Sequence, residues 1–93
     1  MPISYDPAKR LRTLLDRGID FEDAAALFEG PTLTLSDDRR DYGEVRFLTY
    51  GLLGGRLMLV VWTPRQRTRH VISMRKCNDR EQKKIAHRLG ESR

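Results

Sequence analysis

The sequence has little of what disulfides, metal sites and membrane spans require. It holds one cysteine, Cys77, and two histidines, His70 and His87, with no CxxC or HxxxH spacing. An internal disulfide is therefore excluded, and we expect neither a metal ion nor another cofactor. No apolar run approaches the length of a membrane span, and residues 1–6 lack the basic-then-apolar layout of a signal peptide. We expect a cytoplasmic protein without membrane contact.

Charge, by contrast, is plentiful and unevenly distributed. Residues 1–50 contain seven Lys/Arg against ten Asp/Glu, whereas residues 51–93 contain eleven against three, a local balance of +8. A basic half on a small domain is typical of proteins that bind a polyanion, most commonly RNA or DNA. The alternative interpretation is a solvated surface whose excess charge only keeps the protein soluble. The arginines, however, fall beside an apolar strand rather than in a tail, which favours contact with nucleic acid.

The length and the helix signals indicate a small mixed fold. Ninety-three residues suffice for one domain with a modest core, which we expect over residues 1–93. Asp6-Pro7 is typical of a helix start and Gly18 of its end. A second helix is expected over residues 20–29, before Gly30-Pro31.

Strand signals follow the two helices. Four β-prone segments, joined by polar or glycine-rich turns, are expected to form an antiparallel sheet over residues 32–35, 45–50, 57–62 and 69–75. Asn78 with Glu81 resembles a capping box and predicts a C-terminal helix. Two helices, a four-stranded meander and a last helix make an α+β fold.

Three charged residues of the predicted sheet suggest RNA cleavage without a metal. Glu44 and Arg46 are two residues apart, so strand alternation points both to one face, and Arg75 ends the last strand. Arginines would bind the scissile phosphate and stabilise its developing charge. A base, for which Glu44 is the best candidate, would take the proton of the ribose 2′-hydroxyl, which then attacks the phosphate. The products would be a cyclic phosphate and a free 5′-hydroxyl.

Further basic residues are candidates for RNA binding. Lys76, Arg80 and Lys83 continue from the end of the last strand onto the final helix. The plainer interpretation is a solvated helix face, with Glu44 and Arg46 as a surface ion pair worth ~0–1 kcal/mol. Spacing alone favours a binding patch over a catalytic site.

Cys77 presents a second chemical possibility. It lies at a strand–helix junction beside Lys76, where the pKa of a thiol can fall. No histidine is implied nearby, so a cysteine nucleophile is not favoured.

Several short segments occur in a characteristic order: Tyr5-Asp6-Pro7-Ala8-Lys9, Gly18-Ile19-Asp20-Phe21-Glu22-Asp23-Ala24, Gly43-Glu44-Val45-Arg46-Phe47, Arg56-Leu57-Met58-Leu59-Val60-Val61, Val71-Ile72-Ser73-Met74-Arg75 and Arg80-Glu81. In this order and spacing, the chain resembles the BrnT family of ribonuclease toxins, the toxin half of bacterial type II toxin–antitoxin pairs. The resemblance implies a RelE-like fold, metal-independent RNA cleavage and neutralisation by a small ribbon-helix-helix antitoxin, usually BrnA. In such pairs the antitoxin binds DNA, so DNA contact is expected only through the complex.

Two positions depart from that resemblance. The family usually has Lys-His-Gly at Asp16-Arg17-Gly18, and arginine in place of His70. Arg17 cannot act as a base and is assigned to RNA binding. If the family's histidine takes part in proton transfer, Glu44 or His70 would have to serve as the base here. Since His70 alternates with Ile72 and Met74, we predict that it points away from Arg75, and we favour a structural role for it over that of a base. The alternative function is a catalytically degenerate relative that binds its antitoxin or nucleic acid without cleaving RNA.

Overall fold

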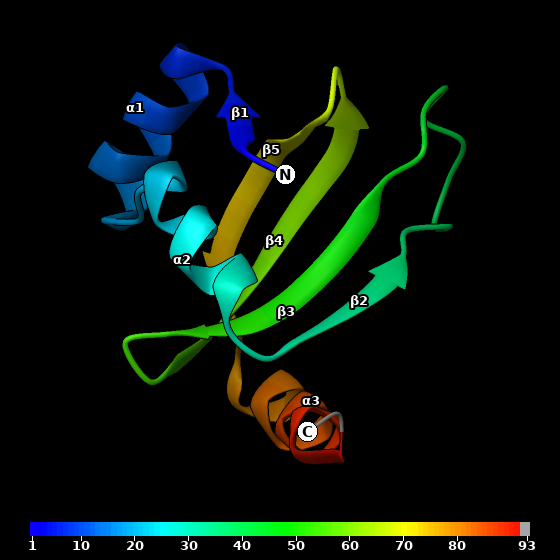
Figure 1. The fold of residues 1–93 in the computed structure, drawn as a ribbon. Coiled ribbons are helices and arrows are strands. Elements are labelled where there is room, and N and C mark those ends of the chain that lie inside the picture. Colours follow the sequence, from blue (N-terminus) through cyan, green and yellow to red (C-terminus); the bar gives the residue numbers. More distant parts are fainter. Residues whose placement is uncertain (92–93) are drawn as a thin grey trace.

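The computed structural model describes residues 1–91 as a twisted sheet with helices on both faces (Figure 1). In chain order the elements are β1 (Ile3–Tyr5), α1 (Pro7–Arg17), the 3-10 turn η1 (Phe21–Asp23), α2 (Ala24–Glu29), β2 (Thr32–Ser36), β3 (Phe47–Leu53), β4 (Arg56–Arg65), β5 (Thr68–Lys76) and α3 (Asp79–Glu91). The predicted α+β class is confirmed.

The sheet contains five strands, not the four predicted, in the order β1-β5-β4-β3-β2. Strands β2 to β5 pair antiparallel, but β1 runs parallel to β5. The prediction missed β1 because it is three residues long and its partner lies near the other end of the chain. No local sequence pattern predicts a pairing between strands so far apart in the chain. The expectation of an entirely antiparallel sheet is therefore wrong at this edge.

A β-bulge interrupts the pairing of β4 with β5. Val61 lies opposite Ser73, but the next residue, Trp62, lies opposite Val71, so Ile72 has no partner across the pair. One extra residue shifts the alternation of side chains by one position. Residues on the two sides of the bulge therefore exchange faces relative to an unbroken strand.

The bulge determines where His70 points. His70 lies opposite Thr63, and Arg75 lies opposite Leu59. Thr63 and Leu59 are four positions apart on β4, so they share a face, and their partners share it too. The prediction that His70 points away from Arg75 is wrong, because it assumed an unbroken alternation along β5.

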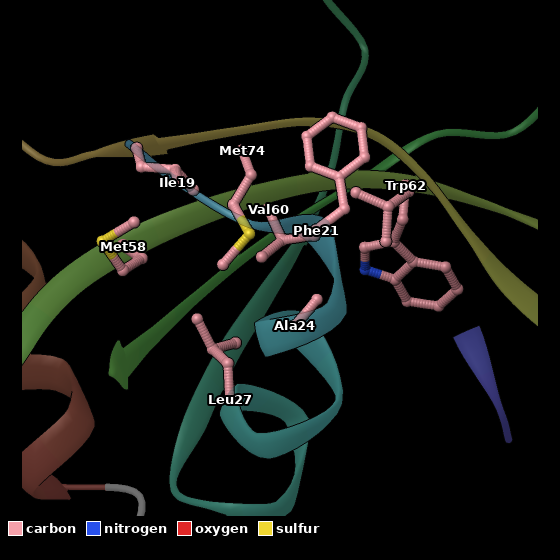
Figure 2. Close-up of a cluster of buried hydrophobic side chains, with 9 residues drawn as sticks. Ile19, Phe21, Ala24, Leu27, Met58, Val60, Trp62 and Met74 are labelled. Carbon is pink, nitrogen blue, oxygen red and sulfur yellow. The ribbon is translucent and has the colours of Figure 1, made fainter. Parts of the chain in front are cut away.

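One face of the sheet is covered by η1 and α2 (Figure 2). Its core consists of Ile19, Phe21, Ala24, Leu27, Met58, Val60, Trp62, Val71 and Met74. Phe21 and Leu27 are fully buried, and each burial contributes about 1.5–3 kcal/mol. Gly51 of β3 allows the close approach of α2, because a Cβ atom there would lie 2.8 Å from Leu27 Cδ2.

The opposite face, which we call the α3 face, packs against α3. Its core consists of Leu57, Leu59, Val61, Cys77, Ile85 and Leu89. The predicted capping box begins α3: Glu81 N–H donates to Asn78 Oδ1 at 2.9 Å, and Asn78 N–H donates to Glu81 Oε1 at 3.0 Å. α3 lies at the end of the sheet opposite the β4–β5 turn (Figure 1). The part of the α3 face near the β4–β5 turn is therefore not covered by α3.

The first helix forms as predicted. Asp6 accepts a hydrogen bond from Ala8 N–H at 2.9 Å, Pro7 occupies the first turn, and Gly18 ends the helix with a φ of 67°. Among residues 1–91, no helix is long and apolar enough to cross a membrane.

Candidate functional site

The α3 face carries two polar clusters with an apolar strip between them. The hairpin-end cluster, near the β4–β5 turn, comprises Glu44, Arg46, Arg65 and His70, and the helix-end cluster, where β5 meets α3, comprises Arg75, Glu81 and the basic residues Arg80, Lys83 and Lys84. The partly buried side chains of Leu48 and Ile72 pack beside Val61 on the strip between them.

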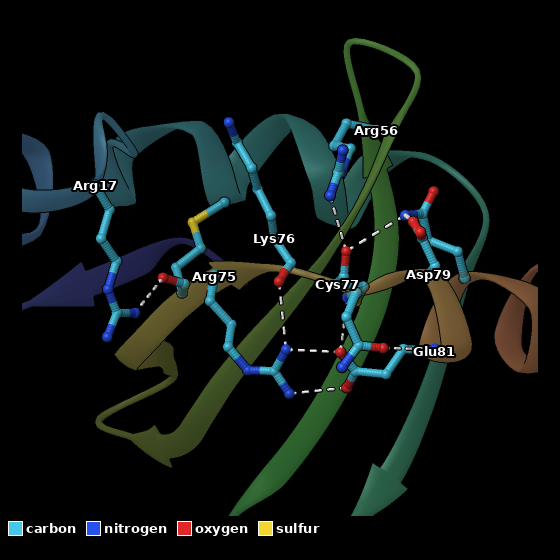
Figure 3. Close-up of polar contacts among 10 residues, drawn as sticks. Arg17, Arg56, Arg75, Lys76, Cys77, Asp79 and Glu81 are labelled. Carbon is cyan, nitrogen blue, oxygen red and sulfur yellow. Dashed lines mark hydrogen bonds and ion pairs between the residues drawn. The ribbon is translucent and has the colours of Figure 1, made fainter.

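The helix-end cluster is organised around Arg75 (Figure 3). Two guanidinium nitrogens of Arg75 donate to the two carboxylate oxygens of Glu81, each at 2.8 Å, and one also donates to the carbonyl of Lys76 at 3.3 Å. Glu81 is also the acceptor of the capping box. These hydrogen bonds, led by those from Arg75, lower the pKa of Glu81 to about 2. The carboxylate thus fixes the position of Arg75 at the start of α3.

The four residues predicted to bind RNA do not share one surface. Arg80 and Lys83 are exposed on α3 and line a shallow hollow with Lys84. Lys76 lies opposite Met58 in the sheet, and its side chain runs away from Arg75 (Figure 3). Arg17, at the end of α1, donates to the carbonyl of Met74 at 3.2 Å. Arg17 and Lys76 therefore approach β5 from the side of the sheet opposite Arg75.

The hairpin-end cluster forms beyond the beginning of β3. The strand begins at Phe47 rather than at the predicted Val45, so Arg46 lies before the strand and not within it, and Glu44 lies before it as predicted. Thr63 Oγ1 nevertheless donates to the carbonyl of Val45 at 2.6 Å, which holds this segment beside β4. Extending the register by one residue from Phe47 opposite Trp62 places Arg46 on the α3 face, and Glu44 contacts Arg65 at the same end of β4. Glu44 and Arg46 also line the same cavity, so the two residues lie close together.

Glu44 pairs with an arginine that the sequence reasoning missed. Arg65 donates from one guanidinium nitrogen to both oxygens of Glu44, at 3.0 and 3.3 Å. This contact is the main reason that the pKa of Glu44 lies below its ordinary value. A lowered pKa makes a carboxylate a weaker base, so the geometry argues for Glu44 as the partner of Arg65. In the sequence, Arg65 is one of several arginines in a turn, and only the strand register distinguishes it.

Arg46 forms no ion pair within residues 1–91, although Glu44 lies near enough for the two charges to interact. Its guanidinium lies over the ring of Tyr42, 4.0 Å from the ring centre, and its buried Nε has no hydrogen-bond partner in the described part of the chain. Stacking on an aromatic ring fixes the guanidinium without neutralising it. Arg46 is therefore held in place by the ring of Tyr42 and not by a salt bridge that an anionic ligand would have to replace.

His70 borders an open cavity at the sheet edge. The cavity has a volume of about 520 Å³ and is lined by Ser4, Arg65, Gln66, Thr68 and His70. Burial, followed by the charge of Arg65, lowers the pKa of His70 from its ordinary 6.5. The imidazole is consequently neutral near pH 7 and able to accept a proton.

The two clusters are separate along the sheet. Arg46 lies near Thr63, which is four residues from Leu59, the partner of Arg75. At roughly 3.3 Å per residue, this corresponds to about 13 Å along β4. The structure therefore brings Glu44 and Arg46 together but sets Arg75 apart from them.

Two other chemistries find no support in this site. Cys77 is buried, and burial raises the pKa of its thiol to about 11, so the possibility of a lowered pKa at this junction is wrong. Within residues 1–91, no group of three or more His, Cys, Asp and Glu side chains is placed to hold a metal ion.

Comparison with known proteins yields one family. Residues 5–81 match the family model described as ribonuclease toxin, BrnT, of type II toxin–antitoxin system. The matched range contains both clusters except for the α3 residues Lys83 and Lys84. Among curated proteins, no relative matches the chain.

Proposed function

Since this chain belongs to the BrnT family of type II ribonuclease toxins, we propose that it is a metal-independent endoribonuclease acting through a ribose 2′-hydroxyl. The observation that carries this proposal is the hairpin-end cluster, which lies within the family match. There Arg46 is fixed on Tyr42 by stacking and not by an ion pair, next to a carboxylate–arginine pair and a neutral histidine.

The arginines supply the electrostatic part of the reaction. Arg46 binds the scissile phosphate and stabilises the negative charge that grows on its oxygens as the 2′-oxygen attacks. Arg75, about 13 Å along the strand, binds a neighbouring phosphate of the same RNA. Glu44 acts in this site through Arg65, which it orients toward the substrate. Of the three residues predicted to be catalytic, we thus propose that Arg46 acts on the scissile phosphate, that Glu44 positions Arg65, and that Arg75 holds the neighbouring phosphate.

RNA binding extends the site toward α3. Arg80 and Lys83 bind the RNA beyond Arg75 on the α3 face. Lys76 and Arg17 bind the RNA where it passes around the edge of the sheet. These contacts are largely to phosphate, so they carry little sequence preference. Affinity for RNA should accordingly fall as salt concentration rises.

Regulation follows from the same charges. We propose that residues 1–93 act as one RelE-like toxin domain in the cytoplasm. A BrnA-like ribbon-helix-helix antitoxin then neutralises the toxin by placing an acidic segment against Arg75, Arg80 and Lys83. Contact with DNA is made by the antitoxin within the complex.

The test is cleavage of a labelled RNA by purified, antitoxin-free protein in the presence of EDTA. We expect fragments with 5′-hydroxyl ends from the wild type. Arg75→Ala should cleave about 10- to 100-fold more slowly, because a hydrogen bond to a charged group contributes about 1.5–3 kcal/mol. Arg12→Ala, an exposed arginine on α1, is the matched control and should keep full activity.

A folded wild-type protein that leaves RNA intact would favour the second candidate, a degenerate toxin relative that only binds. The feature favouring it is Arg17, which stands where the family usually has histidine and whose guanidinium is bound to the Met74 carbonyl. In that case the chain would bind its antitoxin or RNA with the same salt dependence but without products.

A further inference from the structure

A chain of hydroxyl groups connects His70 to the β4–β5 turn. Thr68 Oγ1 donates to the carbonyl of Arg65 at 2.7 Å. Ser4 Oγ lies 2.7 Å from Thr68 Oγ1 and 3.0 Å from His70 Nδ1. β1 brings Ser4 to this place, because its parallel pairing with β5 sets Ser4 opposite His70.

The direction of each hydrogen bond follows from the supply of protons. A carbonyl oxygen only accepts, so Thr68 donates its single hydroxyl proton to the backbone carbonyl of Arg65. The contact between Ser4 and Thr68 must then use the single hydroxyl proton of Ser4. Ser4 has no proton left for the imidazole, so His70 Nδ1 must carry a hydrogen and donate it to Ser4 Oγ. Neutral His70 is thereby held as the Nδ1–H tautomer, and its Nε2 carries a lone pair.

The free nitrogen belongs to a ring in the hairpin-end cluster. Within residues 1–91, Nε2 of His70 has no hydrogen-bond partner, and the ring lines the cavity together with Arg65. The charged groups that act on this ring are Arg65 and Lys9, which disfavour its protonation, and Glu44 and Asp6, which favour it. The bulge at Ile72 turns the ring to the same face as Arg46 and Arg75.

We propose that His70 Nε2 is the general base that takes the proton of the attacking ribose 2′-hydroxyl, with Ser4 and Thr68 as positioning residues that fix its tautomer. This inference rests on the proposed ribonuclease function and replaces Glu44 as the base. It also gives β1 a function, since without that strand the imidazole would have no fixed tautomer.

The reaction step balances as follows. The 2′-oxygen forms a bond to phosphorus while its proton moves to Nε2, giving an imidazolium. The bond from phosphorus to the 5′-oxygen breaks, and the leaving oxygen takes a proton from water. The products are a 2′,3′-cyclic phosphate and a 5′-hydroxyl, and the imidazolium returns its proton to the hydroxide left in solution.

The first experiment measures the tautomer without measuring activity. Nitrogen-15 NMR of the labelled protein at a pH where His70 is neutral should show a protonated Nδ1 and an unprotonated Nε2. Ser4→Ala should weaken this preference. A protonated Nε2 in the wild-type protein would overturn the proposal, whatever the protein does to RNA.

The second experiment measures single-turnover cleavage as a function of pH. In the wild type the rate should rise with pH up to a pKa below 6.5 and then stay constant, because only the neutral imidazole accepts the proton. His70→Asn keeps a donor for Ser4 but provides no base, so cleavage should fall by about 10²-fold or more with RNA affinity unchanged. His87→Asn changes the other histidine of the chain and should leave the rate unchanged.

Each remaining outcome has a distinct meaning. A folded His70→Asn variant that retains the wild-type rate would overturn the role of His70 and leave the ribonuclease function standing. Loss of the acidic limb of the pH profile in Glu44→Gln, with that limb kept in His70→Asn, would return the base to Glu44. A wild type that does not cleave RNA at all would overturn the proposed function and this inference together.

Discussion

The hairpin-end and helix-end clusters lie on the same face of one sheet, but they use their charges differently. At the helix end, Arg75 is bound through two nitrogens to Glu81, which also caps α3. At the hairpin end, Arg46 is held by the ring of Tyr42, and His70 by the hydroxyl of Ser4. The first arrangement pairs a charge while fixing it. At the hairpin end Arg65 and Glu44 form such a pair too, but the contacts of Arg46 and His70 fix these two groups while leaving them available.

This difference predicts which substitutions affect the stability of the fold and which affect only its activity. Paired charges at a helix start join two elements, so their loss should affect folding as well as function. Loss of a group that is held only by an aromatic ring or a hydroxyl should affect folding little. The same loss should strongly weaken the interaction with a bound anion. Substitutions at the helix end should therefore lower stability as well as activity, whereas substitutions of Arg46 or His70 should lower activity with little effect on stability.

The largest expected effect is that of Arg46→Ala. Removing a group that stabilises charge in a transition state costs about 10²- to 10³-fold in rate. We expect single-turnover RNA cleavage to fall by that factor, with a change in melting temperature no larger than that of a typical surface substitution. Arg46→Lys keeps the charge but loses the flat guanidinium over Tyr42, so its rate should be intermediate.

Arg46→Ala would contradict the comparison if it lowered the melting temperature as much as a helix-end variant does. The guanidinium would then be a structural support of the segment before β3, and its buried Nε a part of that packing.

Glu81→Gln should have the next largest effect, this time on stability. The variant loses a charge-assisted pair and weakens the capping box, and the loss of a helix cap costs about 1 kcal/mol. The free energy of unfolding at pH 7 should fall by about 1–2 kcal/mol in denaturant titration. Glu44→Gln, whose carboxylate is paired at the surface, is the matched control and should cost less.

The pH dependence of that loss has a definite sign. Glu81 has a pKa of about 2 in the folded protein against an ordinary 4.5, so its contribution to stability is complete above 4.5 and disappears as pH falls toward 2. The difference between wild type and Glu81→Gln should therefore shrink over this range. A difference that stays constant with pH would show that the carboxylate charge is not what stabilises the start of α3.

Local features of the helix-end cluster could be predicted from the sequence. Asn78 and Glu81 are three residues apart, and a capping box depends only on that spacing and on residue type. The start of α1 at Asp6-Pro7 was predictable for the same reason. Arg75 was correctly placed at the end of a strand, although its pairing with Glu81 was not foreseen.

The hairpin-end cluster depends on features that no short segment of sequence contains. The bulge at Ile72 arises from how β5 fits β4, and it reverses the face of His70. The partner of His70 comes from β1, at the other end of the chain. Arg65 becomes the partner of Glu44 only through the register of two strands. Non-local pairing thus assembles the part of the site that the sequence could not reveal.

The smallest effect is expected at the exposed residues of α3. Lys83 lines a shallow hollow with Arg80 and Lys84 and contributes one positive charge to the path proposed for RNA. Lys83→Ala should weaken binding a few-fold and reduce the slope of log affinity against log salt by about 0.7, the value for one phosphate contact on a single strand. Fluorescence anisotropy between about 50 and about 200 mM salt measures both quantities. Arg12→Ala on α1 removes one charge outside that path and should leave the slope unchanged; an equal reduction in both variants would mean that RNA responds to the net charge of the protein and not to a surface on α3.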